Sequence, residues 1–320
     1  MKSVYISLLM AILLSNVTLA QNSINFIKQG YYPEGIAYYE ADKVFLVSSM
    51  TQGEIGAVNK NGSLSIFIAD TAIISPIGIK INKERGLLYV ANSDIGVSTK
   101  TKEEGQGKMA QVLVYNLKTK KRVAIYDLSK ISGEGNFFAN DLTYDPLGNI
   151  YVTNSFGPHI WKIDSKGKTS IFATSELFKV PINHFGLNGI VYHPDGYLIV
   201  AHYAHGLLYK IPVANPANTT QIELSFTPIG ADGLELIDNN TLLMVVNKSG
   251  AVKLNAAYTL QTSNNWETAK RTKINVLNDG FPTTTTKKGN KVFTLYSHLD
   301  QMLSGAKPAA KNFRIERIKY

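Results

Sequence analysis

Four residues with a side-chain oxygen stand in the same kind of sequence context along this chain. Each comes second in a short motif that leads into an apolar run: Glu34 in "PEGI", Asn140 in "ANDL", Asn188 in "LNGI" and Asp232 in "ADGL". Together they offer two carboxylates and two amides, with no imidazole or thiolate. Such hard oxygen donors suit Ca²⁺, which binds about six to eight oxygens in flexible geometry, better than Mg²⁺ or Zn²⁺. They make one site only if the fold brings them together.

The Asn188-Gly189 dipeptide has a second interpretation, because Asn-Gly closes many β-hairpins. The sequence "PDG" at 194–196 can close the same hairpin. If "PDG" is the turn, Asn188 begins an apolar strand, where a buried amide needs a partner. In the aligned segments described next, "PDG" falls where other segments have "DPLG", "IDNN" and "KKGN". The alignment therefore makes "PDG" the hairpin and places Asn188 on a strand.

Six segments of the chain share one pattern: a strand, a polar turn and a more apolar strand. The second residue of each segment defines a slot, occupied in turn by Glu34, Ile77, Asn140, Asn188, Asp232 and Pro282. Two further segments, 55–68 and 160–173, align with each other without a gap and add a second strand pair to their units. Units of about four strands at this spacing predict an all-β fold, a six-bladed β-propeller. The innermost strand of each blade lines the central channel, so same-slot residues converge on the axis.

The same alignment predicts the surroundings of the slots. The apolar second strands should end beside them, which places Asn92, Asn154, His202, Asn247 and His298 on the rim of a pocket. His202, His298 and His184, the last just before a slot, are candidates either for proton transfer or for plain hydrogen bonding. By contrast, His159 and His193 lie at or near turns and are expected on the surface.

Two other segments are expected to complete the ring and cover it. Ring closure requires a strand from the far terminus, and Ile24–Lys28 can pair with Phe313–Ile318. The insertion at Gly96–Ala110 is expected to form a loop over one face.

The first twenty residues differ from the rest. Lys2 precedes an apolar run, Val4–Leu14, that is too short to span a bilayer, and Ala20 offers a small residue before a cut. This pattern predicts a cleavable signal peptide at 1–20, with an uncleaved anchor as the alternative. The mature chain, 21–320, is expected to be one propeller domain that is secreted or periplasmic. It contains no cysteine and therefore no disulfide.

Charge and hydropathy narrow the choice of partners. The formal net charge is +9, but the lysines cluster in short polar runs such as Lys118–Arg122 that flank strands. Without a basic groove interleaved with aromatic residues, nucleic acid is not expected as a partner. No run after the leader is long enough to span a membrane, so stable membrane insertion is not expected either. The expected state is a monomer that binds a small-molecule substrate.

At the slot motifs the sequence resembles the SMP-30/gluconolactonase/paraoxonase-like superfamily, and within it the extracellular branch described as calcium-dependent phosphotriesterases. The segments "YPEG", "ANDLTYDPLGNIYVTNS", "LNGIVYHPDGYLIV" and "GADGLEL" carry the resemblance. It implies one catalytic Ca²⁺ held by Glu34, Asn140, Asn188 and Asp232, and hydrolysis of a lactone, ester or phosphoester. It also implies that Asp232 acts as general base or nucleophile, with a metal-activated water as the rival nucleophile.

Departures from the family pattern limit what carries over. Sugar lactonases of this family have an arginine at the place of Phe138, so a sugar-acid lactone is disfavoured and a more apolar pocket is expected. Paraoxonases have an acidic residue at the place of Gly35, which makes a second calcium doubtful. Related strictosidine-synthase-like propellers lack the full set of slot residues. The alternative to a hydrolase is a non-enzymatic propeller with structural calcium that binds a ligand or a protein partner.

Overall fold

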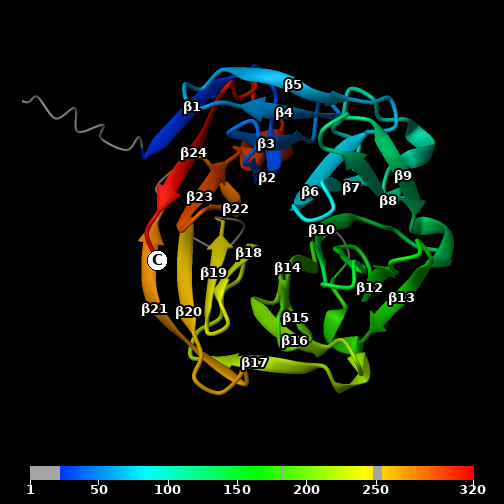
Figure 1. Cartoon of the computed structure of the whole chain (residues 1–320), viewed down its shortest axis with the longest axis vertical. Coiled ribbons are helices and arrows are strands. Elements are labelled where there is room, and N and C mark those ends of the chain that lie inside the picture. Colours follow the sequence, from blue (N-terminus) through cyan, green and yellow to red (C-terminus); the bar gives the residue numbers. More distant parts are fainter. Residues whose placement is uncertain (1–21, 182–183, 248–253, 278) are drawn as a thin grey trace, which may run out of the picture.

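The strands of this chain stand in sheets around a central axis, as the computed structural model shows for residues 22–181, 184–247, 254–277 and 279–320 (Figure 1). The predicted signal peptide lies outside these described residues. Four sheets have four strands each and one has eight. The innermost strands contact one another in cyclic order, β2, β6, β10, β14, β18 and β22. The architecture is a β-propeller, as predicted.

The first three sheets follow the chain order from the inside outwards. The strands are β2 (Pro33–Tyr39), β3 (Val44–Ser49), β4 (Glu54–Val58) and β5 (Leu64–Ala69); β6 (Ser75–Asn82), β7 (Leu87–Ser93), β8 (Ala110–Asn116) and β9 (Arg122–Asp127); and β10 (Ala139–Tyr144), β11 (Ile150–Asn154), β12 (His159–Ile163) and β13 (Thr169–Thr174). All pairings within them are antiparallel.

The eight-stranded sheet consists of two antiparallel halves. They comprise β14 (Leu187–His193), β15 (Tyr197–His202), β16 (Leu207–Pro212) and β17 (Thr220–Leu224), then β18 (Ala231–Asp238), β19 (Thr241–Val246), β20 (Ala256–Gln261) and β21 (Thr268–Val276). A short parallel pairing between the outermost strands β17 and β21 joins the halves. Gly196, with φ 86°, forms the predicted hairpin turn between β14 and β15.

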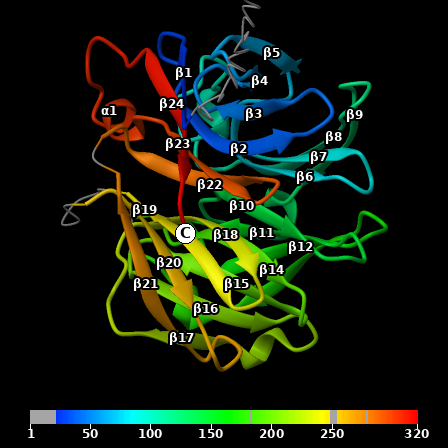
Figure 2. The same ribbon diagram turned by 60° about the vertical axis from the view of Figure 1, so that its left-hand side comes forward.

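The last sheet closes the ring with both ends of the described chain. Its strands are β22 (Pro282–Lys288), β23 (Lys291–Tyr296), β24 (Asn312–Ile318) and β1 (Ser23–Ile27). Antiparallel pairing of β1 with β24 brings Ser23 opposite Glu316 and Ile27 opposite Asn312, as the sequence predicted. Figure 2 shows β1 and β24 side by side, with the short helix α1 (Leu299–Leu303) above β22. In the part of the chain that the structure describes, no helix is long and apolar enough to cross a bilayer.

The core lies between neighbouring sheets, where large side chains such as Trp161, Trp266 and Tyr151 are fully buried. Two histidines belong to it, so their expected place on the surface was wrong. His193 does stand at the hairpin, but it stacks on Tyr197 and its Nε2 lies 2.8 Å from the Asn239 carbonyl. His159 is also buried, with Nε2 3.1 Å from Asn154 Nδ2.

Every innermost strand carries a pairing irregularity at the same point. The register with the second strand shifts between Pro33 and Ile36 in β2, and between the equivalent pairs Pro76/Ile79, Ala139/Leu142, Leu187/Ile190, Ala231/Leu234 and Pro282/Thr285. The slot residue is the first one inside this bulge. By this register the sixth slot holds Thr283 and not Pro282, which corrects the sequence alignment. The run "TTTT" at 283–286 gave no distinguishing residue to align.

The residue after the slot explains the motifs that look like turns. A Cβ at Gly189 would lie 2.3 Å from the Asp232 carbonyl oxygen, and one at Gly35 would lie 2.4 Å from the Ile77 carbonyl oxygen. Each of these carbonyls belongs to the slot residue of the next unit in the ring. Neither glycine is among those with positive φ. Glycine is needed here for the close approach of two backbones, not for a turn.

Candidate metal centre

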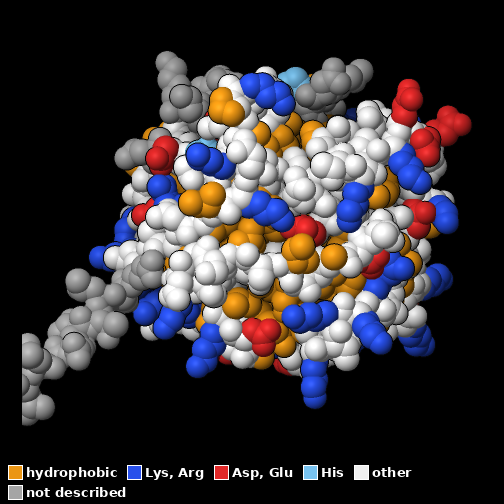
Figure 3. All heavy atoms as spheres, turned by 90° about the horizontal axis from the view of Figure 1, so that it is seen from above, with side chains coloured by type: hydrophobic (Ala, Val, Ile, Leu, Met, Phe, Trp, Pro, Cys, Tyr) orange, Lys and Arg blue, Asp and Glu red, His pale blue; other side chains and the backbone are white. Residues whose placement is uncertain are grey.

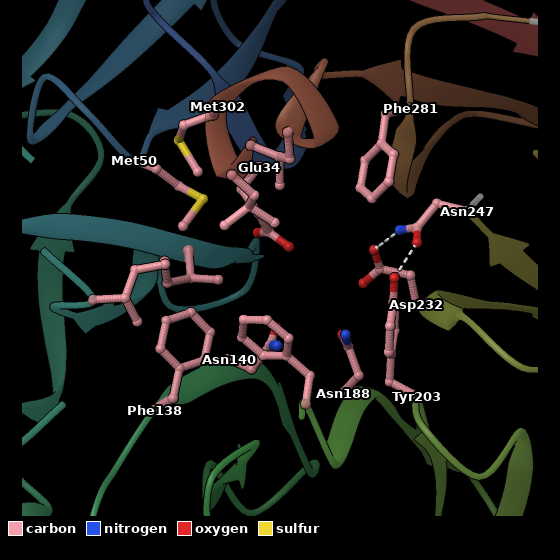
Figure 4. A pocket seen from close by; sticks show the side chains of 15 residues that line it. Glu34, Met50, Phe138, Asn140, Asn188, Tyr203, Asp232, Asn247, Phe281 and Met302 are labelled. Atoms are coloured by element: carbon pink, nitrogen blue, oxygen red, sulfur yellow. Dashed lines mark hydrogen bonds between the residues drawn. The ribbon is translucent and has the colours of Figure 1, made fainter. Parts of the chain in front are cut away.

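The four oxygen-bearing residues predicted as ligands lie around one space at one end of the channel. Glu34, Asn140, Asn188 and Asp232 come from β2, β10, β14 and β18, and their exposed fractions are 7%, 4%, 5% and 6%. All four line the same small cavity, of about 60 Å³. Figure 4 shows their side chains directed into the space between the strands. The fold thus assembles side chains that lie far apart in the sequence.

Hydroxyl groups fix the backbone beneath these side chains. Ser48 Oγ donates to the Ile77 carbonyl at 2.6 Å, Thr153 Oγ1 to the Asn188 carbonyl at 2.8 Å, and Thr283 Oγ1 to the Glu34 carbonyl at 2.7 Å. Each bond ties one unit of the ring to the slot of its neighbour. The main-chain acceptors at these slots are thereby satisfied, which leaves the side-chain oxygens to face the axis.

Two buried oxygens at the site have no hydrogen-bond partner among the described residues, Glu34 Oε2 and Asn140 Oδ1. The amide of Asn140 is oriented from behind, because its Nδ2 donates to Ser155 Oγ at 2.8 Å. Ser155 Oγ in turn donates to the Leu187 carbonyl at 2.6 Å. Two buried acceptors left unpaired side by side at one cavity require an explanation. A bound cation supplies one, since both oxygens are hard donors.

The carboxylate of Asp232 is held from one side. Asn247 Nδ2 donates a short hydrogen bond to Asp232 Oδ2, and the Tyr203 hydroxyl donates to Asn247 Oδ1. The side chain of Asn188 also hydrogen-bonds Asp232. These contacts orient the carboxylate at the floor of the cavity.

Electrostatics at the floor favour a positive charge. Burial raises the pKa of Glu34 well above its usual range, and the charges of Asp232 and Asp141 raise it further. Burial and the charge of Asp141 likewise raise the pKa of Asp232, against the hydrogen bonds from Asn247 and Asn188. A divalent cation among these oxygens would oppose both increases in pKa. The donor set therefore fits a hard cation such as Ca²⁺.

Among the described residues, no group of three or more His, Cys, Asp or Glu side chains could hold a metal ion. The set assembled here contains two carboxylates and two amides, so it falls below that count. Amide oxygens are nevertheless ordinary ligands of Ca²⁺.

The walls above the floor are apolar. Apart from the four predicted ligands, Tyr203 and Asn247, the lining consists of Met50, Ile77, Ile95, Phe138, Phe185, Phe281, Leu299, Met302 and Leu303. Phe138 packs edge-on against Phe185, with ring centroids 5.5 Å apart. Ile95 comes from the segment between β7 and β8, and the last three side chains come from α1. We call this end of the channel the upper mouth.

The residues predicted for the rim are distributed unevenly. Phe138 and Asn247 line the upper cavity. Asn154 is buried behind it and accepts a hydrogen bond from the Phe138 main chain at 3.0 Å. The other predicted rim residues are not among the lining side chains. Asn92 accepts hydrogen bonds from the backbone of Ile74 and Ser75, and His202 is buried against the Lys179 carbonyl. His184 is exposed, and His298 precedes α1.

Two polar residues of the site were not foreseen, Tyr203 and Ser155, and neither were the apolar side chains of the wall other than Phe138 and the slot residue Ile77. Ser155 carries a signal in the repeated dipeptide "NS", because Ser93 Oγ makes the equivalent bond to the Ala139 carbonyl at 3.1 Å. Tyr203 carries no such signal, since no other unit has a tyrosine at that place.

The opposite end of the channel, which we call the lower mouth, opens into a larger cavity of about 630 Å³. Lys80, Lys83 and Lys287 line it together with Glu84 and Glu235. Lys80 also lines the narrow cavity directly beneath the slots, which it shares with Asp141 and the four predicted ligands. The channel is thus polar and charged below the slots and apolar above them.

Comparisons with known proteins agree with the fold. No protein-family model matches the chain, and no curated protein matches it. A gluconolactonase from Xanthomonas campestris is 10% identical with a TM-score of 0.60, over 92% of this chain and 89% of that one. A calcium-binding regucalcin from Agrobacterium tumefaciens is 15% identical with a TM-score of 0.58, over 91% and 92%. A virginiamycin B lyase from Staphylococcus aureus is 13% identical with a TM-score of 0.53, over 92% and 98%.

At these low identities the TM-scores establish a shared fold and no more. The structures that this chain resembles include a gluconolactonase and regucalcin, which agrees with the fold that the sequence resemblance implied. They also include a lyase, so the fold by itself does not select a reaction.

Proposed function

We propose that this protein is a calcium-dependent hydrolase of the SMP-30/gluconolactonase type, acting on a lactone, ester or phosphoester of apolar character. The proposal rests chiefly on one observation: four buried oxygen donors converge on the axis, and two of their oxygens lack a partner among the described residues. The gluconolactonase and regucalcin neighbours support it. We count the two halves of the eight-stranded sheet as separate blades, which gives a six-bladed propeller.

Glu34, Asn140, Asn188 and Asp232 would hold the ion. When bound, Ca²⁺ supplies a Lewis acid for the carbonyl or phosphoryl oxygen of the substrate. Asp232 is the candidate general base or nucleophile, because its carboxylate lies at the cavity floor and is held in place by the side chains of Asn247 and Asn188. The apolar walls exclude water from the floor and hold the body of the substrate.

The walls also indicate the substrate class. A sugar-acid lactone carries several hydroxyls, each of which loses its water on binding and needs a new partner. Above the floor, the described lining offers only Tyr203 and Asn247 as polar side chains, and both are engaged with each other. Phe138 stands where an arginine would be expected for a sugar acid. An alkyl- or aryl-substituted substrate fits these walls better.

The setting of the protein is also part of the proposal. We propose that residues 1–20 are a signal peptide cut after Ala20, so that the mature chain is secreted or periplasmic. We also propose that the mature chain is a monomer. Nucleic acid is not a proposed partner: on the face in Figure 3 the lysines and arginines are scattered rather than gathered into one basic patch.

The test is calcium-dependent turnover by the purified mature chain. A series of γ-lactones with short and long alkyl chains, an aryl ester, an aryl phosphotriester and gluconolactone would be compared with calcium and with chelator. We expect turnover only with calcium, highest for an apolar substrate, and lost in Asp232→Ala while the folded state persists. Turnover that survives chelation, or that Asp232→Ala leaves intact, would overturn the mechanism.

A second candidate function is a non-enzymatic propeller in which calcium is structural. The small size of the upper cavity, about 60 Å³, favours it, as does the resemblance to a chain of a nidogen/laminin complex, at a TM-score of 0.51. In that case calcium would stabilise the fold, and none of the substrates above would be hydrolysed.

A further inference from the structure

We propose that Tyr203 and Asn247 are positioning residues that fix the orientation of the Asp232 carboxylate at the cavity floor. The inference deepens the proposed function and rests on it. Its basis is a directed chain of hydrogen bonds (Figure 4): the Tyr203 hydroxyl donates to Asn247 Oδ1, and Asn247 Nδ2 donates to Asp232 Oδ2. Each bond points toward the carboxylate.

The backbone fixes both residues at one place. Tyr203 follows β15 and Asn247 follows β19, in the two halves of the eight-stranded sheet. Gly230 links them, because its N–H donates to the Tyr203 carbonyl at 2.9 Å and its carbonyl accepts from the Asn247 N–H at 3.1 Å. A Cβ at Gly230 would lie 2.6 Å from the Asn247 carbonyl oxygen, and its φ is 81°. Only glycine fits between these two hydrogen bonds, because a side chain would collide there and the positive φ disfavours other residues.

The side-chain amide of Asn247 needs a partner that fixes its orientation. Its two ends have almost the same shape but opposite hydrogen-bonding character. If the amide turned over while Asp232 is ionised, Oδ1 would face Asp232 Oδ2, and two acceptors would meet in a buried space where Asn247 is only 1% exposed. The Tyr203 hydroxyl opposes this by donating to Oδ1. Tyr203 therefore keeps the amide N–H₂ on Asp232 Oδ2, and together with the hydrogen bond from Asn188 this fixes the orientation of the carboxylate.

Tyr203 also belongs to the wall of the upper cavity, beside Phe185 with ring centroids 6.3 Å apart. A ligand against the wall touches the same side chain that orients Asp232. The site thus connects the apolar wall to the carboxylate through two side chains. Neither would be recognised as functional from its residue type alone.

The test compares calcium affinity in wild type, Tyr203→Phe, Asn247→Ala and the double variant by titration calorimetry. Losing one hydrogen bond of this kind should weaken calcium binding about threefold to tenfold in Tyr203→Phe, and more in Asn247→Ala. The double variant should bind no more weakly than Asn247→Ala alone, because both residues act through one chain. Tyr144→Phe is the matched control: its hydroxyl donates to the Ile81 carbonyl at 3.1 Å near the lower mouth, and its affinity should equal that of wild type.

A second readout does not depend on calcium. In the metal-free protein, the side-chain amide protons of Asn247, assigned by their absence in Asn247→Ala, should exchange slowly with water in wild type and faster in Tyr203→Phe. Equal exchange in the two proteins, or independent losses of affinity that multiply in the double variant, would overturn the positioning role. Failure of wild type to bind calcium, with the exchange difference present, would instead remove the metal site and leave the positioning of Asp232 standing.

Discussion

The two mouths of the central channel differ in how their buried charges are satisfied. At the upper mouth, Glu34 and Asp232 lie beneath apolar walls, and Glu34 Oε2 has no partner among the described residues. In the narrow cavity below the slots, toward the lower mouth, Asp141 accepts hydrogen bonds from the main chain of Leu142 at 2.8 Å and of Ile190 at 3.3 Å. Burial raises the pKa of Asp141, and the charge of Lys80 opposes the rise. Within the described lining, the chain brings its own cations to the lower cavity and none to the upper one.

This difference teaches that cavity size is a poor guide to chemistry. The lower cavity, of about 630 Å³, is roughly ten times larger than the upper one, of about 60 Å³. Yet the smaller one is lined by Glu34 and Asn140, whose unpaired buried oxygens cost free energy unless a cation binds them.

The contrast between the two mouths would be refuted most clearly if the four oxygen-bearing residues at the upper mouth did not bind calcium. At a hundred times its dissociation constant, calcium should raise the free energy of unfolding by about 2.7 kcal/mol. Asn188→Ala should remove more than half of this gain, because it deletes one donor. Thr143→Ala, on the wall of the lower cavity, should keep the gain whole. Thermal melting with calcium and with chelator measures both. Equal gains in all three proteins would place the ion elsewhere.

The pH dependence should separate the metal-free from the calcium-bound protein. The pKa values of Glu34 and Asp232 are raised in the folded state, so the folded protein holds protons that the unfolded chain has released. The metal-free protein should therefore lose stability as pH rises above the ordinary carboxyl values of 3.8 to 4.5. The loss should be about 1.4 kcal/mol per pH unit for each carboxyl that is protonated only in the folded state.

With calcium the trend should be the opposite, because protons compete with the ion for the same oxygens. Urea unfolding at several pH values, with chelator and with calcium, measures both trends. Glu34→Gln should flatten the metal-free slope. Identical slopes under the two conditions would mean that these carboxylates do not bind the ion.

The variant Lys80→Met tests whether a charge at the lower mouth affects calcium binding at the upper mouth. Removing the ammonium takes away the charge of Lys80, which opposes the raised pKa values of Asp141 and Glu235, and leaves only Lys287 to oppose that of Glu235. We expect a loss of about 1 kcal/mol in unfolding free energy, because the region is only partly buried, and a several-fold tighter binding of calcium above. Lys83→Met, in the wall of the same cavity, is the control and should change neither quantity. Unchanged calcium affinity in Lys80→Met would show that the upper and lower mouths of the channel are electrostatically independent.

The smallest effect concerns the upper wall. Leu303→Asn should raise KM for an apolar substrate about fourfold, the equivalent of about 0.8 kcal/mol for one lost methylene contact. Leu147→Asn is the matched control. Leu147 is also an exposed leucine, 73% exposed compared with 54% for Leu303, but it lines neither mouth. Steady-state kinetics on one alkyl lactone decide the point, and equal KM values would exclude α1 from substrate binding.

The slot residues were predictable because a repeat places equivalent side chains on one axis. Asn188 could be separated from a turn by alignment with the equivalent segments of the same chain. The sixth slot could not be placed, because four successive threonines at 283–286 align equally well in neighbouring registers, and only the pairing with β23 identifies Thr283.

Contacts between side chains were harder to foresee. His193 and His159 are buried by partners that no local pattern announces, the Asn239 carbonyl and the Asn154 amide. Tyr203 reaches Asn247 across two halves of a sheet, 44 positions along the chain. The repeat fixes where backbones lie, whereas these partners depend on single side chains that the repeat does not share.

The pairing of β1 with β24 has a consequence for assembly of the molecule. While a chain is being made, β1 has no partner until the last strand of the same sheet exists, so the open ring presents β23 and β1 as free edges. Once β24 is made, a second copy whose ring is still open offers its own β24 and β1, which can pair in the native register. Two molecules exchanging β1 would reproduce every native contact and form a closed dimer. Concentrated refolding therefore selects between intramolecular closure and reciprocal exchange, and dilution favours the former.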